Sequence, residues 1–140
     1  MGFIRRILGG SAGPSAESTG GPVDYSGDMQ VDVAGESYYV VNFERLFPRT
    51  EHGIDATAQA ELVADPSNVY DRNAVRVMIG GLQVGHLNRE AAAAFAPTAQ
   101  RLASQGAVIT CTATVRGGWD QGQGQQGNYG VVLWMRAPDS

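Results

Sequence analysis

One stretch of this chain has the pattern of a β-hairpin, and it constrains the fold more than any other feature. Residues 74–79 read AVRVMI, a short run rich in apolar and β-branched residues that is typical of a strand. Gly80 and Gly81 follow, and such a pair favours the tight turns in which the backbone takes positive φ. Residues 82–87 then form the returning strand. The sequence therefore predicts an antiparallel pair at the centre of the fold.

Other segments extend this prediction to a whole domain. Further strands are expected at residues 29–34, 58–64, 107–116 and 129–136. With the hairpin, they indicate a mostly β protein, a small antiparallel barrel of about six strands similar to oligonucleotide/oligosaccharide-binding (OB) folds. A short helix is expected near 41–47.

One main helix is predicted at about 88–105. Asn88 is a good N-cap, the alanine-rich run that follows has high helix propensity, and Gly106 suits the C-terminal end. Pro97 lies inside this segment and is expected to kink or divide the helix, since its ring clashes with the preceding turn and it lacks an N–H.

The chain of 140 residues is expected to hold one folded domain. Residues 1–27 are rich in Gly, Ser and Pro, a composition typical of a flexible tail, so we expect the domain to span 28–137. Arg5 and Arg6 interrupt the only apolar run of the tail, which argues against a secretory signal and favours a cytoplasmic protein. An anchor to a membrane surface or a partner is the alternative use of this run.

Composition excludes several classes of function. Apolar residues make up 43% and charged residues 17%, as in soluble globular proteins, and no apolar run is long enough for a membrane span. Cys111 is the single cysteine, which excludes a disulfide framework and a cysteine-based zinc site. The net charge is −4, with no Lys among the basic residues, so any contact with nucleic acid should be small and local.

Catalysis has little support in the sequence. The two histidines, His52 and His86, lie in no spacing typical of a zinc site, and no nucleophile elbow or phosphate-binding loop is present. We therefore expect no enzymatic activity, no metal and no cofactor. A small hydrolase is the weakest of the functions considered.

Three short segments combine polar and aromatic residues beside predicted strands: 35–39, 65–75 and 84–90. Exposed aromatic rings on a barrel can stack on unpaired bases. An arginine at the start of a helix can bind a phosphate, and a carboxylate can accept a hydrogen bond from a sugar hydroxyl. These residue types point to a binding surface for single-stranded nucleic acid.

The same segments resemble the HIRAN domain family. Residues 65–75 read DPSNVYDRNAV, close to the family signature D-P-x-N-P-Y-D-x-N-A-V. GESYY at 35–39 and VGHL at 84–87 have the family's order and spacing, and the chain is similar to the family over about 29–137. We identify it as a stand-alone, bacterial-type member. HIRAN domains have an OB-like fold, and eukaryotic members, attached to DNA translocases that remodel stalled forks, capture the 3′-hydroxyl end of single-stranded DNA.

The resemblance implies a role for each residue of a DNA-binding site. Tyr38 and Tyr70 would pack on the terminal nucleotides, and Asp71 would hydrogen-bond the free 3′-hydroxyl. Arg89 matches a basic position that contacts phosphate, and His86 lies beside it.

Tyr129 matches an aromatic position near the C-terminal end of the domain that stacks on a base. The implied ligand is single-stranded DNA, with DNA repair as the setting and a DNA-processing protein as a further partner.

Two departures from the family pattern keep a second function open. Ser37 stands where DNA-binding members carry an Arg, and Val69 replaces the Pro of the signature. With the acidic net charge, they favour a protein-interaction module that has lost DNA binding. Asn68, Asp71 and Asn73 have a structural alternative as well, since such side chains also bond their own loop backbone.

Overall fold

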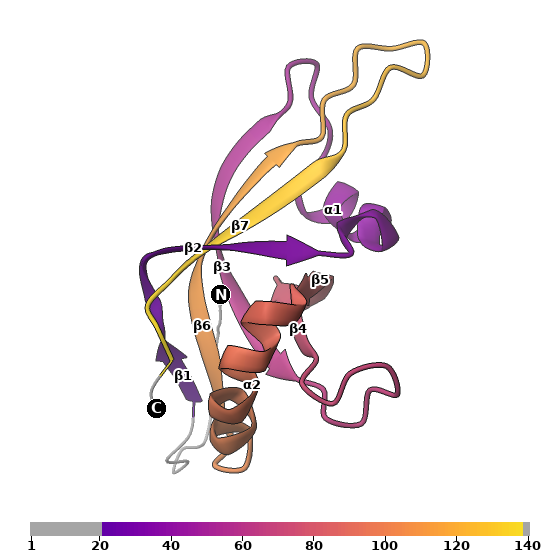
Figure 1. Cartoon of the computed structure of the whole chain (residues 1–140). Coiled ribbons are helices and arrows are strands. Elements are labelled where there is room, and N and C mark those ends of the chain that lie inside the picture. Colours follow the sequence, from indigo (N-terminus) through magenta and orange to yellow (C-terminus); the bar gives the residue numbers. More distant parts are fainter. Residues whose placement is uncertain (1–20, 139–140) are drawn as a thin grey trace.

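The structure, a computed structural model, describes residues 21–138, and Figure 1 shows the arrangement of its elements. Seven strands form a single sheet in this part of the chain. In chain order they are β1 (Gly21–Asp24), β2 (Ser26–Ala34), β3 (Ile54–Ala64), β4 (Val75–Ile79), β5 (Leu82–Leu87), β6 (Ala107–Gly117) and β7 (Tyr129–Met135). The helices are the 3-10 helix η1 (Glu36–Tyr39), α1 (Val40–Leu46) and α2 (Arg89–Ala103).

Six of the strands close into a barrel. They follow the order β6–β3–β4–β5–β2–β7, and β7 pairs again with β6. Every one of these pairings is antiparallel. The predicted mostly β, OB-like barrel is therefore confirmed, and so is the short helix expected near 41–47, which is α1.

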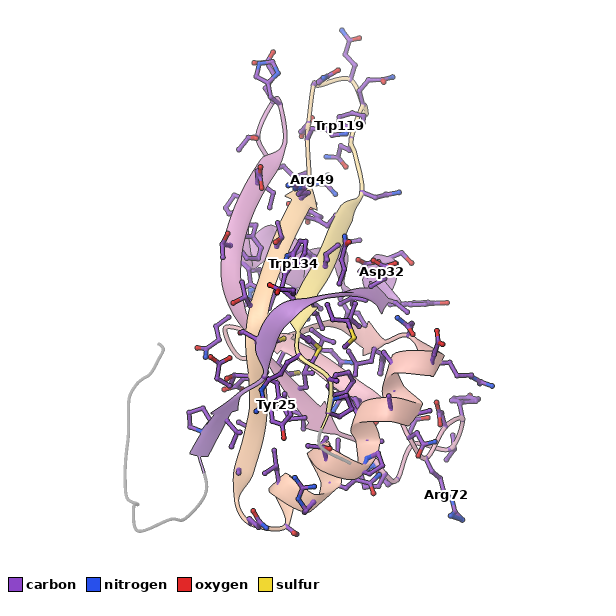
Figure 2. All side chains as sticks on the ribbon, turned by 60° about the vertical axis from the view of Figure 1, so that its left-hand side comes forward. Tyr25, Asp32, Arg49, Arg72, Trp119 and Trp134 are labelled. Carbon is purple, nitrogen blue, oxygen red and sulfur yellow. The ribbon has the colours of Figure 1, made fainter. Side chains whose placement is uncertain are left out.

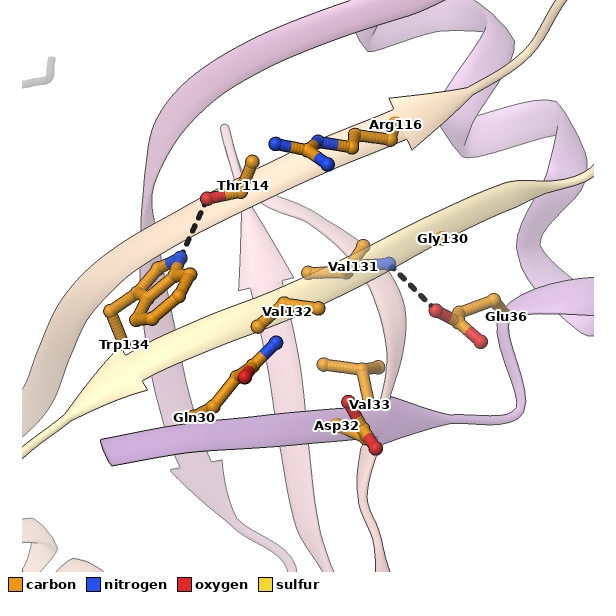
Figure 3. A pocket seen from close by; sticks show the side chains of 10 residues that line it. All are labelled: Gln30, Asp32, Val33, Glu36, Thr114, Arg116, Gly130, Val131, Val132 and Trp134. Carbon is orange, nitrogen blue, oxygen red and sulfur yellow. Dashed lines mark hydrogen bonds between the residues drawn. The ribbon is translucent and has the colours of Figure 1, made fainter. Parts of the chain in front are cut away.

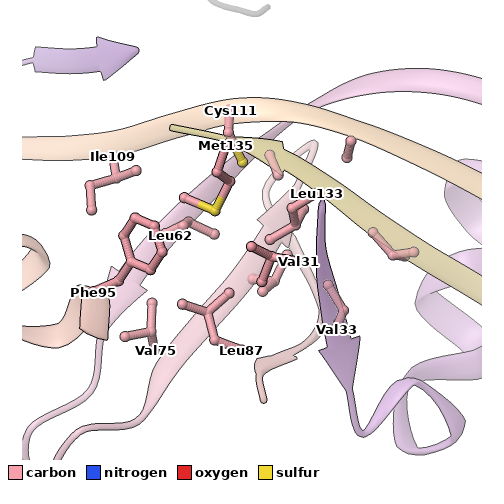
Figure 4. Close-up of a cluster of buried hydrophobic side chains, with 14 of the residues drawn as sticks. Val31, Val33, Leu62, Val75, Leu87, Phe95, Ile109, Cys111, Leu133 and Met135 are labelled. Atoms are coloured by element: carbon pink, nitrogen blue, oxygen red, sulfur yellow. The ribbon is translucent and has the colours of Figure 1, made fainter. Parts of the chain in front are cut away.

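The barrel interior holds the hydrophobic core. The strands alternate buried and more exposed residues, as in β7, where every second side chain faces inward. Helix α2 lies across one end of the barrel (Figure 1) and packs against β3 and β6. Its Phe95 reaches into the interior, and Figure 4 shows it among side chains of the strands, including Leu62, Val75 and Ile109. The core thus fixes the barrel on which the loops are mounted.

The folded body begins earlier than residue 28. β1 pairs in parallel with β6, from Gly21 opposite Ala107 to Asp24 opposite Thr110, and the Tyr25 side chain is buried. The expected boundary is therefore wrong for residues 21–27, which form β1 and the first part of β2. Their composition is poor for a strand, but pairing with β6 overrides local propensity. The rest of the expected tail, residues 1–20, lies outside the described residues.

Helix α2 begins as predicted but is not divided by its proline. The Asn88 side chain accepts a hydrogen bond from the Ala91 N–H at 2.9 Å, which is the expected N-cap. The helix runs without a break through Pro97 to Ala103, so the prediction that Pro97 divides it is wrong. Pro97 and Ala93, whose carbonyl loses its partner, are both exposed, and water can satisfy that carbonyl.

The central hairpin forms at the predicted glycines. Gly80 and Gly81 have φ of 57° and 81°, the two positive values of a type I′ turn. Gly85 on β5 allows a close approach of β2, because a Cβ there would lie 2.6 Å from the Ala34 carbonyl oxygen. This contact joins the hairpin to the end of β2.

Candidate nucleic-acid interface

The three segments singled out from the sequence border one strand of the barrel, β5, on either side of His86. On β5, His86 pairs with Ala34 at the end of β2 and with Arg76 near the start of β4. The end of β2 leads into η1, the loop 65–74 leads into β4, and β5 leads into Arg89. Strand register therefore places the three segments around His86: η1 continues alongside β5 toward Gln83, and the loop 65–74 and the start of α2 lie beyond Leu87.

Helix η1 presents Tyr38 to solvent. Gly35 has a φ of 78°, which turns the chain out of β2, and its carbonyl accepts the Tyr38 N–H at 3.1 Å. The Tyr38 side chain is 86% exposed, whereas Tyr39 packs against the core. A Cβ at Gly35 would lie 3.9 Å from both Tyr38 Cδ2 and His86 Nδ1. Tyr38 and His86 therefore flank the same position on the surface.

The loop 65–74 is held by its own polar side chains. Asn68 Oδ1 accepts the N–H groups of Tyr70 at 2.9 Å and Asp71 at 3.2 Å, and Asp71 Oδ1 accepts the Asn73 N–H at 2.9 Å. The structural alternative considered from the sequence is thus correct for Asn68 and for one oxygen of Asp71. The Asn73 side chain makes no hydrogen bond within residues 21–138.

This ordered loop leaves two groups open to a ligand. The Tyr70 ring is 89% exposed, and Asp71 Oδ2 has no hydrogen-bond partner among the residues that the structure describes. One carboxylate oxygen fixes the side chain, so the other can accept a hydrogen bond from a ligand hydroxyl. Figure 2 shows the neighbouring Arg72 pointing away from the barrel.

His86 has a defined tautomer. The Gln83 side-chain nitrogen donates to the Gly85 carbonyl at 3.2 Å and lies 3.3 Å from His86 Nε2. Because an amide nitrogen can only donate, His86 Nε2 is the acceptor in this contact. A neutral imidazole that accepts at Nε2 carries its proton on Nδ1. Because Nδ1 lies on the side of Gly35 and Tyr38, His86 offers an N–H donor there.

Arg89 is the exposed first residue of α2. The N-terminal amides of a helix favour anions, and the arginine adds a full positive charge at the same end. Glu90 follows it in the first turn and offsets part of this charge.

Tyr129 does not belong to this surface. Its side chain is 6% exposed, its ring stacks on Phe43 with centroids 4.9 Å apart, and its hydroxyl donates to the Phe47 carbonyl at 2.6 Å. Burial raises the pKa of this hydroxyl. The expectation that Tyr129 stacks on a base is therefore wrong for this structure, because the ring is part of the core.

Tyr129 and Arg49 together anchor the long hairpin between β6 and β7. The Arg49 guanidinium lies 4.9 Å from the Tyr129 ring centroid and donates to the Gly127 carbonyl at 2.7 Å. Its Nε pairs with Glu44 at 2.8 Å. Arg49 lies below Trp119 in the view of Figure 2, where the hairpin extends beyond the barrel.

A separate groove of about 630 Å³ lies over β2, β6 and β7 (Figure 3). Trp134 lines it and donates its indole N–H to Thr114 Oγ1 at 2.7 Å. Glu36 accepts the Val131 N–H at 2.8 Å, and burial raises the pKa of the Glu36 carboxyl. Asp32 and Arg116 also line the groove, and Arg116 is paired with Asp55 at 3.4 Å. None of the six sequence-predicted site residues lines it.

Comparisons with known proteins identify the family. A model of the HIRAN domain matches residues 26–118, a span that includes all three converging segments. The chain belongs to the HIRAN domain family. This match confirms the resemblance seen in the sequence. HIRAN domains are DNA-binding modules. The match ends before β7, and Tyr129 lies outside it.

Among solved structures, the chain is similar to the crystal structure of the HIRAN domain of human HLTF. The identity is 22%, the match covers 79% of this chain and 77% of the other, and the TM-score is 0.41. The search of curated proteins gives no match.

Three further properties concern the residues that the structure describes. Within residues 21–138, no group of three or more His, Cys, Asp or Glu side chains is placed to hold a metal ion. No helix in this range is long and apolar enough to cross a membrane. Burial raises the pKa of the Cys111 thiol to about 12, so this cysteine stays protonated at neutral pH.

Proposed function

We propose that this HIRAN domain binds single-stranded DNA at a 3′-hydroxyl end and performs no chemistry of its own. The observation that carries the proposal is the placement of η1, the loop 65–74 and the start of α2 around His86 on β5. Each segment supplies a group with a distinct use: an exposed ring, an open carboxylate oxygen and an exposed cation.

Stacking supplies most of the affinity in this proposal. Tyr38 and Tyr70 expose nearly the whole of their side chains, and base stacking on an aromatic ring contributes about 1–3 kcal/mol per base. Stacking tolerates every base, so the domain should bind without strong sequence preference. Arg89 adds a phosphate contact that depends on salt concentration.

Asp71 supplies the preference for the end. A 3′-hydroxyl donates a hydrogen bond to the open Oδ2, whereas a 3′-phosphate places negative charge against it. Two like unit charges about 4 Å apart repel by about 4 kcal/mol at an effective dielectric near 20. The proposed site therefore discriminates strongly against phosphorylated ends.

The setting that fits this ligand is DNA repair in the cytoplasm, where single-stranded 3′ ends arise during the processing of damaged DNA. A DNA-processing protein that generates or extends such ends is the matching partner.

The test is a fluorescence anisotropy titration of short labelled strands at two salt concentrations. Strands ending in a 3′-hydroxyl, strands ending in a 3′-phosphate and a blunt duplex are compared. The proposal expects the 3′-hydroxyl strand to bind most tightly, with affinity that falls as salt rises. Equal binding of the two single strands would remove the end-recognition mechanism and leave general single-strand binding.

A protein-interaction module is the second candidate, and the groove of Figure 3, lined by Asp32, Glu36 and Arg116 beside apolar side chains, favours it. Asp32 and Glu36 lie beside the apolar surface of Trp134 and Val132 there, a combination suited to a basic and apolar peptide segment. If no single strand binds even at low salt, this function replaces the first.

A further inference from the structure

A second basic residue lies next to His86 on the outer face of the barrel. Arg76 on β4 pairs with His86 on β5 and, on its other side, with Val63 on β3. Directly opposite residues on neighbouring strands lie side by side, about 4.5–5.5 Å apart at Cβ. Val75 and Val77, its neighbours in the chain, are fully buried, so Arg76 faces outward with His86.

The Arg76 side chain differs from those of two other arginines of the domain, which form ion pairs. Arg49 pairs with Glu44 and Arg116 pairs with Asp55, but within residues 21–138 Arg76 makes no ion pair and no hydrogen bond. It is half buried, and its Nε atom is buried without any partner. The two terminal nitrogens of the guanidinium are neither bonded nor buried in this part of the chain, so an anion can bind them, and a charge without a protein partner favours such a ligand.

The position relates Arg76 to the proposed site. His86 directs its Nδ1–H toward Gly35 and Tyr38, while Arg76 lies on the opposite side of His86, one strand further from Tyr38. Arg89 follows His86 by three residues along the chain. Two cations thus approach the His86 position from different directions, one from α2 and one from β4.

We infer that Arg76 is a phosphate-binding residue, and that the bound strand continues from Tyr38 across the outer face of β5 onto β4. The inference rests on the proposed function and extends it. A guanidinium offers five N–H donors in a planar fork that suits phosphate oxygens. A strand with a single phosphodiester cannot occupy the positions beside Arg89 and Arg76 together, so longer strands gain affinity through Arg76.

The experiment measures the affinities of the full chain for thymidine strands of two to eight nucleotides with 3′-hydroxyl ends. Arg76→Gln removes the charge and keeps a side chain of similar shape. This variant should lower the affinity for the longer strands about tenfold, as expected for the loss of a hydrogen bond to a charged group. It should also flatten the plot of log affinity against log salt by about 0.7, the value for one phosphate on a single strand.

Arg116→Gln is the matched control. It removes the same charge from an exposed strand position, and its partner Asp55 lies eight residues from Val63 on β3, about 27 Å along a strand. It should leave affinity and salt dependence almost unchanged. Arg76→Lys keeps the charge and should retain most of the salt dependence, and melting temperatures of all variants report folding.

The outcomes separate the inference from the function beneath it. If the native chain binds 3′-hydroxyl strands and Arg76→Gln behaves like Arg116→Gln at every length, the role of Arg76 is refuted and end binding stands. If the native chain binds no single strand at low salt, both proposals are overturned.

Discussion

Tyrosines occupy two regions of this domain, and the structure gives them opposite environments. At the edge formed by η1 and the loop 65–74, Tyr38 and Tyr70 are 86% and 89% exposed. At the start of β7, Tyr129 is 6% exposed, stacked on Phe43 and bonded through its hydroxyl. The family resemblance assigned all three to DNA, yet only the first two have rings that a base can reach.

The difference teaches how to separate binding residues from structural ones in such a fold. A large ring that is left in water contributes little to folding, and clustered exposed aromatics mark binding surfaces. A ring that is packed and hydrogen-bonded stabilises the domain instead. The first region should therefore govern ligand affinity and the second should govern stability, and substitutions can test each half of this statement.

The largest expected effect is on stability, at Tyr129. Tyr129→Ala should lower the free energy of unfolding by about 3–5 kcal/mol, the usual cost of removing a buried aromatic ring. Tyr129→Phe keeps the stacking on Phe43 and loses only the bond to the Phe47 carbonyl, at about 1 kcal/mol. Urea unfolding followed by circular dichroism measures both values. A loss below about 1 kcal/mol for Tyr129→Ala would mean that the ring is not part of the core.

The next effect is on binding, at the exposed tyrosines. Tyr38→Ala and Tyr70→Ala should each weaken the binding of single-stranded DNA by about 1–3 kcal/mol. The free energy of unfolding should change by no more than about 0.5 kcal/mol. Anisotropy titrations and urea unfolding of the same samples give the two numbers. Unchanged affinity in both variants would contradict the assignment of this edge as the binding surface.

The smallest expected effect is a gain in affinity for single-stranded DNA, at Ser37. Ser37→Arg places a cation next to Tyr38 on the exposed side of η1, the position at which the family resemblance implies an arginine. It should strengthen binding and steepen the salt dependence by about 0.7 for a single strand. Ser37→Gln is the uncharged control of similar length. If the arginine and glutamine variants bind alike, no phosphate passes this position.

The barrel was predictable because periodicity reports directly which side of a strand is buried. The hairpin turn at Gly80 and Gly81 and the N-cap at Asn88 were predicted correctly, since both depend on local chemistry. β1 was missed, because its pairing with β6 is a long-range contact that a sequence rich in Gly and Pro does not reveal. The continuous path of α2 through Pro97 was missed because it depends on which face of the helix meets water.

The candidate site was predictable in part. The motifs predict a site of Tyr38, Tyr70, Asp71, His86 and Arg89, and strand register places their segments around His86. The burial of Tyr129 had a signal, since it shares the inward phase of Val131 and Leu133 in β7. Arg76 has the outward phase of its strand, but its position beside His86 depends on cross-strand register, which the sequence does not show.

A double-mutant cycle between Asp71 and the 3′-hydroxyl tests the central claim most directly. The native chain and Asp71→Asn are each titrated with two strands of the same sequence, one ending in a 3′-hydroxyl and one in a 3′-deoxy nucleotide. The cycle isolates the interaction of this carboxylate with this hydroxyl, because neither change adds charge to the strand. The account predicts a coupling energy of about 1.5–3 kcal/mol, the range for a hydrogen bond to a charged group. A coupling energy near zero, with tight binding of both strands, would contradict it.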